Sequence, residues 1–376
     1  MAVSAAARVP YVKHVFIVVL ENENASSTFG KYSEAPYLAH TLKRRGAFVP
    51  NYYAIAHNSL TDYVAMVSGQ AANPQAQADC QYFTEFFPGM PTGDGQYRGT
   101  GCVYPTPVQT IVNQLEDSGY KWKGYMEDMN AAAPPGKEER CRHPGLNHQD
   151  HTQSAEVGDQ YAARHNPFVY FHSIIDFPTC ERHDVDLSHL RKDLRYRRTT
   201  PNYSFISPNL CHDGHDEPCV NGEPGGLKSA NRWMRNWIPA ILHAPAFKSR
   251  GLLIVTFDEA EGSGADADSS ACCHEKSGPN VIPPNTPGAL HPGPGGGRVG
   301  AVVVSPCIKP HTVSKRDYNH YSLLRSIERN FRLPYLGYAG QSGLRPFGRD
   351  ILSRAGCGGK SRMHADFRRP FLGALD

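Results

Sequence analysis

Five short, largely apolar runs constrain the fold of this chain more than any other feature of its sequence. They lie at residues 15–20, 168–171, 203–206, 252–257 and 299–304. The runs at 15–20, 252–257 and 299–304 are rich in Val and Ile, without strict alternation of apolar and polar residues. Strands of this kind are covered on both faces, as in parallel sheets. We therefore predict five buried parallel strands.

Helical patterns lie between these runs, and they decide the fold class. We expect helices at 36–45, 59–69, 106–119, 228–242 and 320–331. The third would begin with Thr106 as its cap and Pro107 at its first helical position, and Gly119 would end it. Strands alternating with helices predict an α/β fold with a mainly parallel central sheet between layers of helices. No break in composition marks a boundary, so we predict one domain over residues 1–376.

Two long segments, 70–105 and 261–297, are rich in Gly, Pro, Asp and Ser and read as insertions, either functional lids or loops held by disulfides. The chain has ten cysteines, none in a C-x-x-C motif. Loop positions and the even count predict the pairs Cys80–Cys102 and Cys141–Cys180, then Cys211–Cys219 and Cys307–Cys357, although connectivity does not follow from sequence alone. The adjacent Cys272 and Cys273 either bond to each other or stay reduced.

Disulfides indicate an oxidising compartment. The first residues of the chain, Met1 to Ala5, contain no apolar signal-peptide stretch. Either a leader has been removed or the chain is cytoplasmic, and we favour a secreted or periplasmic protein. The longest apolar run has six residues, Val15 to Leu20, against the ~20 needed to span a bilayer. Lys and Arg (39) nearly balance Asp and Glu (36), which argues against a nucleic-acid partner.

Acidic and amide side chains follow the predicted strands, where open α/β sheets bind ligands. Glu21 and Asn22 follow the first run, and Asp258 and Glu259 follow the fourth. The run at 203–206 leads to the segment from His212 to His215. Neighbouring carboxylates repel one another unless a cation lies between them, so the two pairs predict a hard-metal site. The alternative is that each pair caps a helix or lies in a solvated loop.

Ser59 also has two interpretations. It would be the N-cap of the helix at 59–69, with Asp62 three residues later in a pattern that resembles a capping box. The same position exposes its hydroxyl to the positive end of the helix dipole, where backbone N–H groups bind phosphate oxygens. A cation would favour the alkoxide and His57 would assist proton transfer. Spacing alone does not choose between a cap and a nucleophile.

Six motifs in order resemble the bacterial and fungal phosphoesterase family of secreted acid phosphatases and phosphocholine-type phospholipases C, within the alkaline phosphatase-like superfamily. The resemblance covers residues 13 to about 350, and length and paired cysteines are more similar to the acid phosphatase branch. The motifs are His14–Asn22, His57–Tyr63, Pro201–His215, Thr256–Glu259, Gly297–Pro306 and Tyr318–Arg325.

The resemblance implies a site and a reaction. Glu21, Asn22, Asp258 and Glu259 would hold a divalent metal ion (Ca²⁺, Zn²⁺, Mg²⁺ or Mn²⁺), with Ser59 as both nucleophile and ligand. His57, His215 and His320 would contact the phosphoryl oxygens or the leaving group, and Asp213 would orient a histidine or bind the metal. A phosphate monoester, either a small molecule or a phospholipid headgroup, would be hydrolysed through a phosphoserine.

Asp62 departs from the family pattern, which usually has an asparagine there. A carboxylate facing a phosphate dianion would repel it. Two alternatives to a phosphomonoesterase therefore stay open: a phosphodiesterase or phospholipase C, and a catalytically weakened secreted protein that binds phosphate esters or lipid headgroups.

Overall fold

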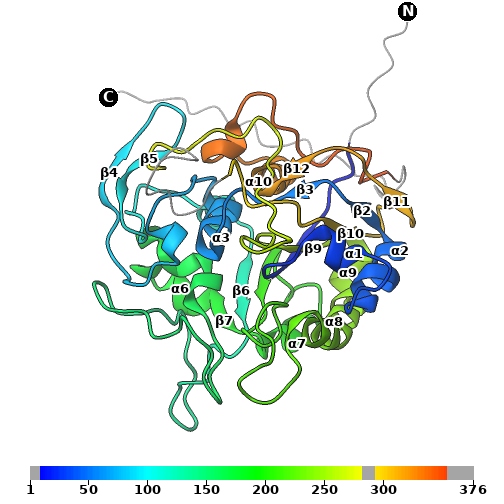
Figure 1. Cartoon of the computed structure of the whole chain (residues 1–376), viewed down its shortest axis with the longest axis horizontal. Coiled ribbons are helices and arrows are strands. Elements are labelled where there is room, and N and C mark those ends of the chain that lie inside the picture. Colours follow the sequence, from blue (N-terminus) through cyan, green and yellow to red (C-terminus); the bar gives the residue numbers. More distant parts are fainter. Residues whose placement is uncertain (1–8, 282–292, 354–376) are drawn as a thin grey trace, which may run out of the picture.

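The computed structural model describes residues 9–281 and 293–353, and its centre is an eight-stranded sheet (Figure 1). Across the sheet the strands are β11 (Thr312–Val313), β2 (Ala47–Val49), β10 (Ala301–Val304), β9 (Gly251–Phe257), β1 (His14–Leu20), β8 (Tyr203–Ser207), β6 (Trp122–Met126) and β7 (Asp184–Asp186). Two small sheets pair β12 (Tyr318–Asn319) with β3 (Tyr52–Tyr53) and β4 (Phe87–Pro91) with β5 (Tyr97–Thr100).

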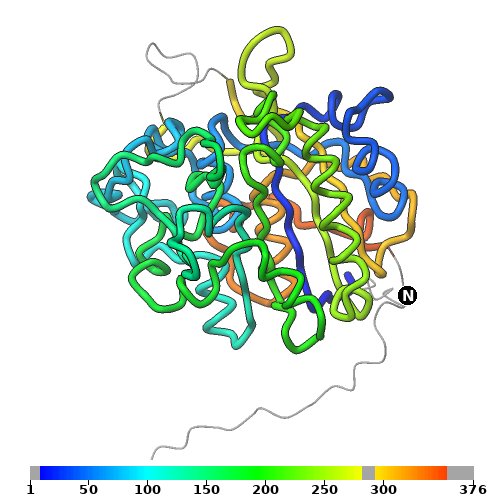
Figure 2. The backbone as a smooth tube through the Cα atoms, turned by 90° about the horizontal axis from the view of Figure 1, so that it is seen from below, coloured from blue at the N-terminus to red at the C-terminus, as the bar shows by residue number. Residues whose placement is uncertain are grey.

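The five strands from β9 to β7 are parallel. Three of them, β9, β1 and β8, are the apolar runs predicted at 252–257, 15–20 and 203–206, whereas β6 and β7 were not predicted. Every residue of β1 and β9 is buried, which explains why neither run alternates. Figure 2 shows β1, in dark blue, running through the middle of the molecule. The expectation of a parallel strand at 299–304 is wrong, because β10 pairs antiparallel with both β9 and β2. The chain leaves β9 at the carboxyl end of the sheet and enters β10 at that same end, so β10 must run in the opposite direction to β9.

Helices cover both faces of the sheet. The α-helices are α1 (Ala25–Phe29), α2 (Lys43–Arg45), α3 (Ser59–Ser68), α4 (Ile111–Asp117), α5 (His172–Ile175), α6 (Thr179–His183), α7 (His189–Asp193), α8 (Gly226–His243), α9 (Pro245–Arg250) and α10 (His320–Phe331). In Figure 1, α3 and α10 lie above the sheet and α7 and α8 lie below it. The expected α/β fold with a mainly parallel sheet between helices is confirmed.

Short helical turns complete the fold: a π-helix, η1 (Tyr37–Leu42), and the 3₁₀ helices η2 (Ala76–Ala78), η3 (Ala163–His165), η4 (Pro167–Tyr170) and η5 (Gly337–Gly340). The prediction of a strand at 168–171 is wrong. Pro167 opens η4 there, and the Asn166 side chain accepts a hydrogen bond from the Phe168 N–H. The expected start at Thr106 is also wrong, since Thr110 caps α4 through a capping box with Asn113.

Disulfides link the loops in the predicted pattern. Cys80–Cys102, Cys141–Cys180 and Cys211–Cys219 are bonded, which confirms three pairs. Cys272 and Cys273 bond to each other, which settles the alternative that the sequence left open. Cys307 is disulfide-bonded, but its predicted partner Cys357 lies outside the described residues.

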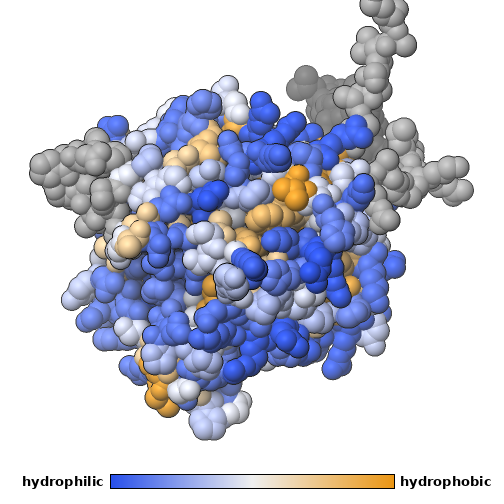
Figure 3. All heavy atoms as spheres, turned by 45° about the vertical axis from the view of Figure 1, so that its right-hand side comes forward, coloured by the Kyte–Doolittle hydropathy of each residue, from blue (hydrophilic) through white to orange (hydrophobic). Residues whose placement is uncertain are grey.

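Hydrophilic side chains dominate the face of the molecule in Figure 3, where apolar residues appear as scattered spots. Within residues 9–281 and 293–353, no helix combines the length and the apolar character needed to cross a bilayer.

Candidate active site

The two pairs of predicted metal ligands meet at the carboxyl ends of β1 and β9. These strands are in register, with Leu20 opposite Phe257, so Glu21–Asn22 and Asp258–Glu259 emerge side by side. The Asn22 backbone N–H donates to Asp258 Oδ1 at 3.1 Å, and the Glu259 N–H donates to the same oxygen at 2.7 Å. Asn22 has a left-handed backbone (φ 52°), which asparagine tolerates better than most residues. The structure thus brings all four residues together.

Ser59 lies at the first position of α3 and points toward this group. Its Oγ donates to Glu21 Oε1 at 2.7 Å. The residue before it, Asn58, occupies the N-cap position, with φ 72° and no side-chain capping bond. Asp62 does not complete a capping box either, because its Oδ1 accepts from the backbone N–H groups of Ile55 and Ala56, at 2.8 and 3.4 Å. The interpretation of Ser59 as a cap is therefore wrong.

Two basic side chains that the sequence analysis missed also converge on Glu21 Oε1. His165 Nε2 lies 3.0 Å from that oxygen and Arg164 Nη2 lies 3.8 Å from it. The His165 ring stacks on Tyr63 of α3, with ring centroids 5.2 Å apart. The only sequence signal was a pair of basic residues directly before Asn166–Pro167. Because η3 is an isolated turn without periodicity, nothing in the local sequence linked the pair to Glu21.

The predicted histidines lie at different depths. His215 lines the cavity beside Ser59, and its Nδ1 lies 3.4 Å from Asp216 Oδ1. His57 is buried beside the cavity: its Nδ1 lies 2.6 Å from Glu259 Oε2 and its Nε2 lies 2.9 Å from Ser269 Oγ. Asp213 Oδ1 accepts from the His215 backbone N–H, and Asp213 Oδ2 lies 3.8 Å from His165 Nδ1. Asp213 is thus placed to orient His165, a partner the sequence did not identify.

His320 lies behind the acidic pair, fully buried at the start of α10. Its Nε2 lies 2.5 Å from the Asp258 carbonyl oxygen and 3.3 Å from Asp62 Oδ1, and its Nδ1 lies 3.0 Å from the Tyr52 hydroxyl. Neither His320 nor Asp62 lines the cavity beside Ser59. The expectation that His320 contacts the substrate does not fit this position, and Asp62 does not face the place where a phosphate would bind.

A polar cavity of about 400 Å³ opens above these groups. Among the described residues that line it, Arg164 is the permanent cation and His215 is the other basic group. The remaining lining residues are Glu21, Asn22, Asn58, Ser59, Asp79, Gln153, Ser154, Ala155, Asp216, Val220 and Glu259. The cavity has room for a phosphate ester next to the Ser59 hydroxyl.

Burial and mutual repulsion set the ionisation of the site. Burial raises the pKa of Asp258 well above its usual value, and the nearby Glu21 and Asp62 raise it further. Burial and then Asp258 likewise raise the pKa of Glu259. Burial would raise the pKa of Glu21 as well, but His165 and Arg164 hold it well below its usual value. The hydrogen bond to Asp216 raises the pKa of His215 to about 9, against the opposing effect of burial.

Several buried oxygens at this site lack a hydrogen-bond partner among the described residues: Glu21 Oε2, Asn22 Oδ1, Asp213 Oδ2 and Asp258 Oδ2. Leaving a buried polar atom unpaired costs about 1–3 kcal/mol. Ligand atoms of Glu21, His165 and Asp258 lie within 4.8 Å of one another. Oxygen ligands of this number and spacing fit a divalent cation, so the residues present suit a metal site.

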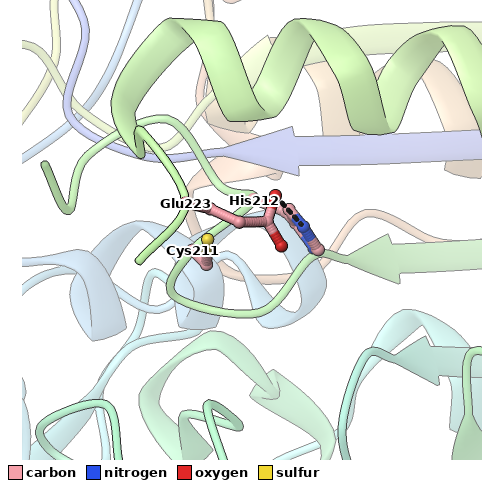
Figure 4. Close-up of side chains that lie close together, drawn as sticks. All are labelled: Cys211, His212 and Glu223. Atoms are coloured by element: carbon pink, nitrogen blue, oxygen red, sulfur yellow. Dashed lines mark ion pairs between the residues drawn. The ribbon is translucent and has the colours of Figure 1, made fainter. Parts of the chain in front are cut away.

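A second group of potential ligands, Cys211, His212 and Glu223, does not suit a metal (Figure 4). Cys211 is bonded to Cys219, so its sulfur is not available as a thiolate. His212 Nδ1 already lies 3.0 Å from Glu127 Oε2, and its Nε2 lies 3.9 Å from Glu223 Oε2. His212 is thus held between the carboxylates of Glu127 and Glu223, and neither ring nitrogen is free to bind a metal.

Comparison with known proteins finds phosphatases among the relatives of this chain. The chain is 23% identical over 328 residues to a probable acid phosphatase of Kluyveromyces lactis, covering 86% of this chain and 59% of that protein. It is 25% identical over 299 residues to a phosphate-repressible acid phosphatase of Penicillium chrysogenum, covering 79% and 54%. The chain thus spans little more than half the length of these fungal relatives. A phosphatidylinositol-3-phosphatase of Mycobacterium tuberculosis is 24% identical over 335 residues, covering 89% of this chain and 82% of that protein.

A solved structure and a family model give two further comparisons, one for the fold and one for the family. A crystal structure of a protein in the alkaline phosphatase superfamily from Vibrio parahaemolyticus shares the fold, with a TM-score of 0.50 and 12% identity over 92% of this chain and 72% of that one. The model of the Phosphoesterase family matches residues 34–334, which is most of the chain. This protein is a member of the Phosphoesterase family.

Proposed function

We propose that this chain is a metal-dependent phosphomonoesterase that acts through a phosphoserine at Ser59. The observation that carries the proposal is the contact between Ser59 Oγ and Glu21 Oε1 at 2.7 Å, in a cavity that Arg164 and His215 also line. The acid phosphatases and the phosphatidylinositol-3-phosphatase among the relatives support phosphomonoester chemistry. The disulfides support an extracellular or periplasmic location.

Glu21, Asn22, Asp258 and Glu259 would hold a divalent cation, and His165 is placed to join them. When bound, such a cation lowers the pKa of a hydroxyl and offsets negative charge on phosphoryl oxygens. The unpaired oxygens of Glu21, Asn22 and Asp258 are the atoms available to it. His57 would orient Glu259, and His320 would fix the Asp258 backbone, so both act as positioning residues.

Substrate binding and bond formation are assigned to groups that line the cavity. Arg164 would bind non-bridging phosphate oxygens, since its guanidinium is held by the Gln153 carbonyl at 2.8 Å and lies beside Glu21 and Asp79. Ser59 Oγ would give its proton to solvent by way of Glu21 Oε1, to which it already donates, and attack phosphorus as the bond to the ester oxygen breaks. His215, whose pKa the hydrogen bond to Asp216 raises to about 9, would give the leaving alcohol its proton. Water would then hydrolyse the phosphoserine.

The test compares a chromogenic phosphomonoester with a chromogenic phosphodiester, before and after removal of divalent metal with a chelator. We expect turnover of the monoester, its loss on chelation and its recovery when a divalent metal is added back. Mass spectrometry of acid-quenched enzyme should find one phosphoryl group on the peptide containing Ser59. Chelator-resistant turnover would reject the metal dependence, and a preferred diester would favour the phospholipase-like alternative.

The position of Asp62 does not favour the alternative of a catalytically weakened protein that only binds phosphate esters. Its carboxylate is fully buried, contacts Ile55 and Ala56, and does not line the cavity. The departure from the family pattern therefore lies outside the part of the site where substrate would bind.

A further inference from the structure

The segment that leads from the end of β7 to the start of β8 carries a group of exposed cations that the proposed reaction does not use. Residues 189–198, which form α7 and the turn after it, contain five cationic side chains and one carboxylate. The five are Arg191, Lys192, Arg195, Arg197 and Arg198, all exposed. The whole chain has 39 Lys and Arg against 36 Asp and Glu, so this excess is local. We call these five residues the basic surface.

The cations of the basic surface are not neutralised within the protein. Asp193, the one carboxylate of the segment, is paired with Lys123 at 2.6 Å. No carboxylate oxygen of the described residues lies within 4.0 Å of any of the five. Their contacts are with neutral groups instead: Arg197 donates to the Pro245 carbonyl at 3.2 Å, and Arg191 donates to Asn236 Oδ1 at 2.8 Å. A cluster of like charges without counter-charges attracts a polyanion.

Aromatic rings and a groove lie within this surface. The Arg191 guanidinium lies over Trp237, 4.6 Å from its centroid, and that of Arg198 lies over Tyr196 at 5.0 Å. Tyr196 is 55% exposed. A groove of about 240 Å³ runs between α7 and the α8–α9 junction, lined by Arg191, Leu194, Arg195, Ala240, His243, Ala244 and Pro245. Two guanidinium groups beside an open groove can bind a phosphate, and an exposed tyrosine suits the headgroup layer of a bilayer.

More cations extend the surface along the starts of the strands. Exposed Lys13 and Lys121 directly precede β1 and β6. Asn202, which precedes β8, ties them together: its Nδ2 donates to the Lys13 carbonyl at 3.0 Å and its Oδ1 accepts from the Lys121 N–H at 3.0 Å. The cations thus lie along one end of the sheet, as contact with a flat anionic surface requires.

We propose that the basic surface docks this protein on an anionic phospholipid bilayer. Juxtamembrane Lys and Arg side chains are attracted to anionic lipid, and exposed aromatic residues anchor in its interface. The disulfides support an oxidising compartment outside the cytoplasm, where a bilayer surface is more available than nucleic acid.

This orientation has a consequence that rests on the proposed function. The docking surface lies at the amino ends of strands whose carboxyl ends carry the site, and β9, with seven residues, spans roughly 20 Å. The cavity beside Ser59 would face away from the bilayer. The docked enzyme would therefore hydrolyse water-soluble phosphate esters and not the headgroups of the membrane that holds it.

The experiment measures sedimentation of the full chain with vesicles of phosphatidylcholine alone, or of three parts phosphatidylcholine to one part phosphatidylglycerol. We expect binding to the anionic vesicles only, weakening when salt rises from about 0.1 M to about 0.5 M. The variant R195Q/R197Q/R198Q should bind about a hundredfold more weakly, at about fivefold per cation. The control R98Q/K315Q/R316Q removes three exposed cations outside the basic surface and should bind like the unaltered protein.

Melting temperature and turnover of a soluble monoester check that both triple variants fold. Equal binding to the two vesicle types would overturn the proposal, as would equal losses in the two triple variants. Tighter binding to a short single-stranded RNA than to anionic vesicles at the same salt would reassign the surface to nucleic acid and also overturn it. Vesicle binding requires no turnover, so Ser59→Ala should bind normally, which separates failure here from failure of the proposed function.

Discussion

The two ends of the central sheet are made by the same strands but present polar groups in opposite states. At the carboxyl ends, Glu21 and Asp258 are buried, and each has an oxygen without a hydrogen-bond partner. Toward the amino ends the cations Lys13 and Arg195 are exposed, and the Lys13 backbone N–H is paired with the Arg250 carbonyl. Exposed charges are stabilised by water, whereas buried unpaired oxygens require a ligand or a proton.

The buried polar groups of the proposed active site and the exposed cations of the basic surface are thus separated along the sheet. A buried polar atom without a hydrogen-bond partner lowers the stability of the folded protein. Such atoms at the carboxyl ends therefore indicate a functional site, where a bound ligand would pair with them. An exposed cation costs little, so the amino ends can collect many of them.

Ser59→Ala should have the largest effect, because it removes the nucleophile from the carboxyl-end cavity. We expect turnover of a chromogenic monoester to fall by on the order of 10⁴-fold or more, in a protein that still folds. The matched control is Ser68→Ala at the other end of α3, where the hydroxyl donates to the Val64 carbonyl at 2.7 Å. Ser68→Ala should lose about 1 kcal/mol of stability and keep its turnover. Near-normal turnover by folded Ser59→Ala would refute the mechanism.

Arg164→Met tests whether the cavity cation binds the phosphoryl group. We expect kcat/KM for the monoester to fall by about 10²–10³-fold, and inhibition by inorganic phosphate to weaken in parallel. Arg142→Met is the control, since Arg142 pairs with Asp159 at 2.6 Å and does not line the cavity. If the two variants lose activity equally, Arg164 acts through stability and not by binding substrate.

Asp184 is a buried carboxyl outside the cavity that, like Asp258, has an oxygen without a hydrogen-bond partner. It lies at the start of β7, an edge strand of the sheet, whereas the cavity lies at the ends of the central strands β1 and β9. Burial raises its pKa to about 7, opposed by the hydrogen bond from Asn166 Nδ2 at 2.6 Å. The folded state therefore keeps a proton that the unfolded state releases near pH 4, so this group lowers stability as pH rises from about 4 to about 7. The buried Asp184 carboxyl is thus neutralised by a proton, whereas the carboxylates of the proposed active site would be neutralised by a bound cation.

Asp184→Asn should remove this pH dependence. We expect the free energy of unfolding of the variant, relative to the unaltered protein, to improve by about 2–4 kcal/mol between pH 4 and pH 8. Urea denaturation at several pH values measures the difference. A difference that stays constant over this range would show that the carboxyl is ionised in the folded protein at low pH.

Asp62→Asn should have the smallest effect. The amide keeps an oxygen that can accept from the Ile55 and Ala56 N–H groups, and the residue does not line the cavity. We expect turnover to change by less than tenfold, which corresponds to about 1.4 kcal/mol in the barrier. A rise well above tenfold would mean that the carboxylate does repel the substrate, and that the family asparagine is favoured for that reason.

Local sequence was sufficient for much of the fold. The runs that became β1 and β9 are buried over their whole length, so their composition alone reveals strands covered on both faces. The α10 pattern matched its observed bounds, His320–Phe331, because one apolar stripe faces the core. Four candidate ligands could be predicted for the same reason: in a parallel sheet, residues that follow neighbouring strands emerge at one edge.

The sequence alone was enough for the buried strands β1, β8 and β9, for the polar pairs that follow β1 and β9, and for the order of the family motifs. The tertiary structure decided that β10 runs antiparallel, that Asp62 turns toward Ile55 and His320, and that Arg164 and His165 meet Glu21. Arg164 and Glu21 are far apart in the chain, and η3 has no periodic pattern to reveal its direction. Local propensity fixes how a segment folds, whereas packing of distant segments fixes which side chains share a buried oxygen.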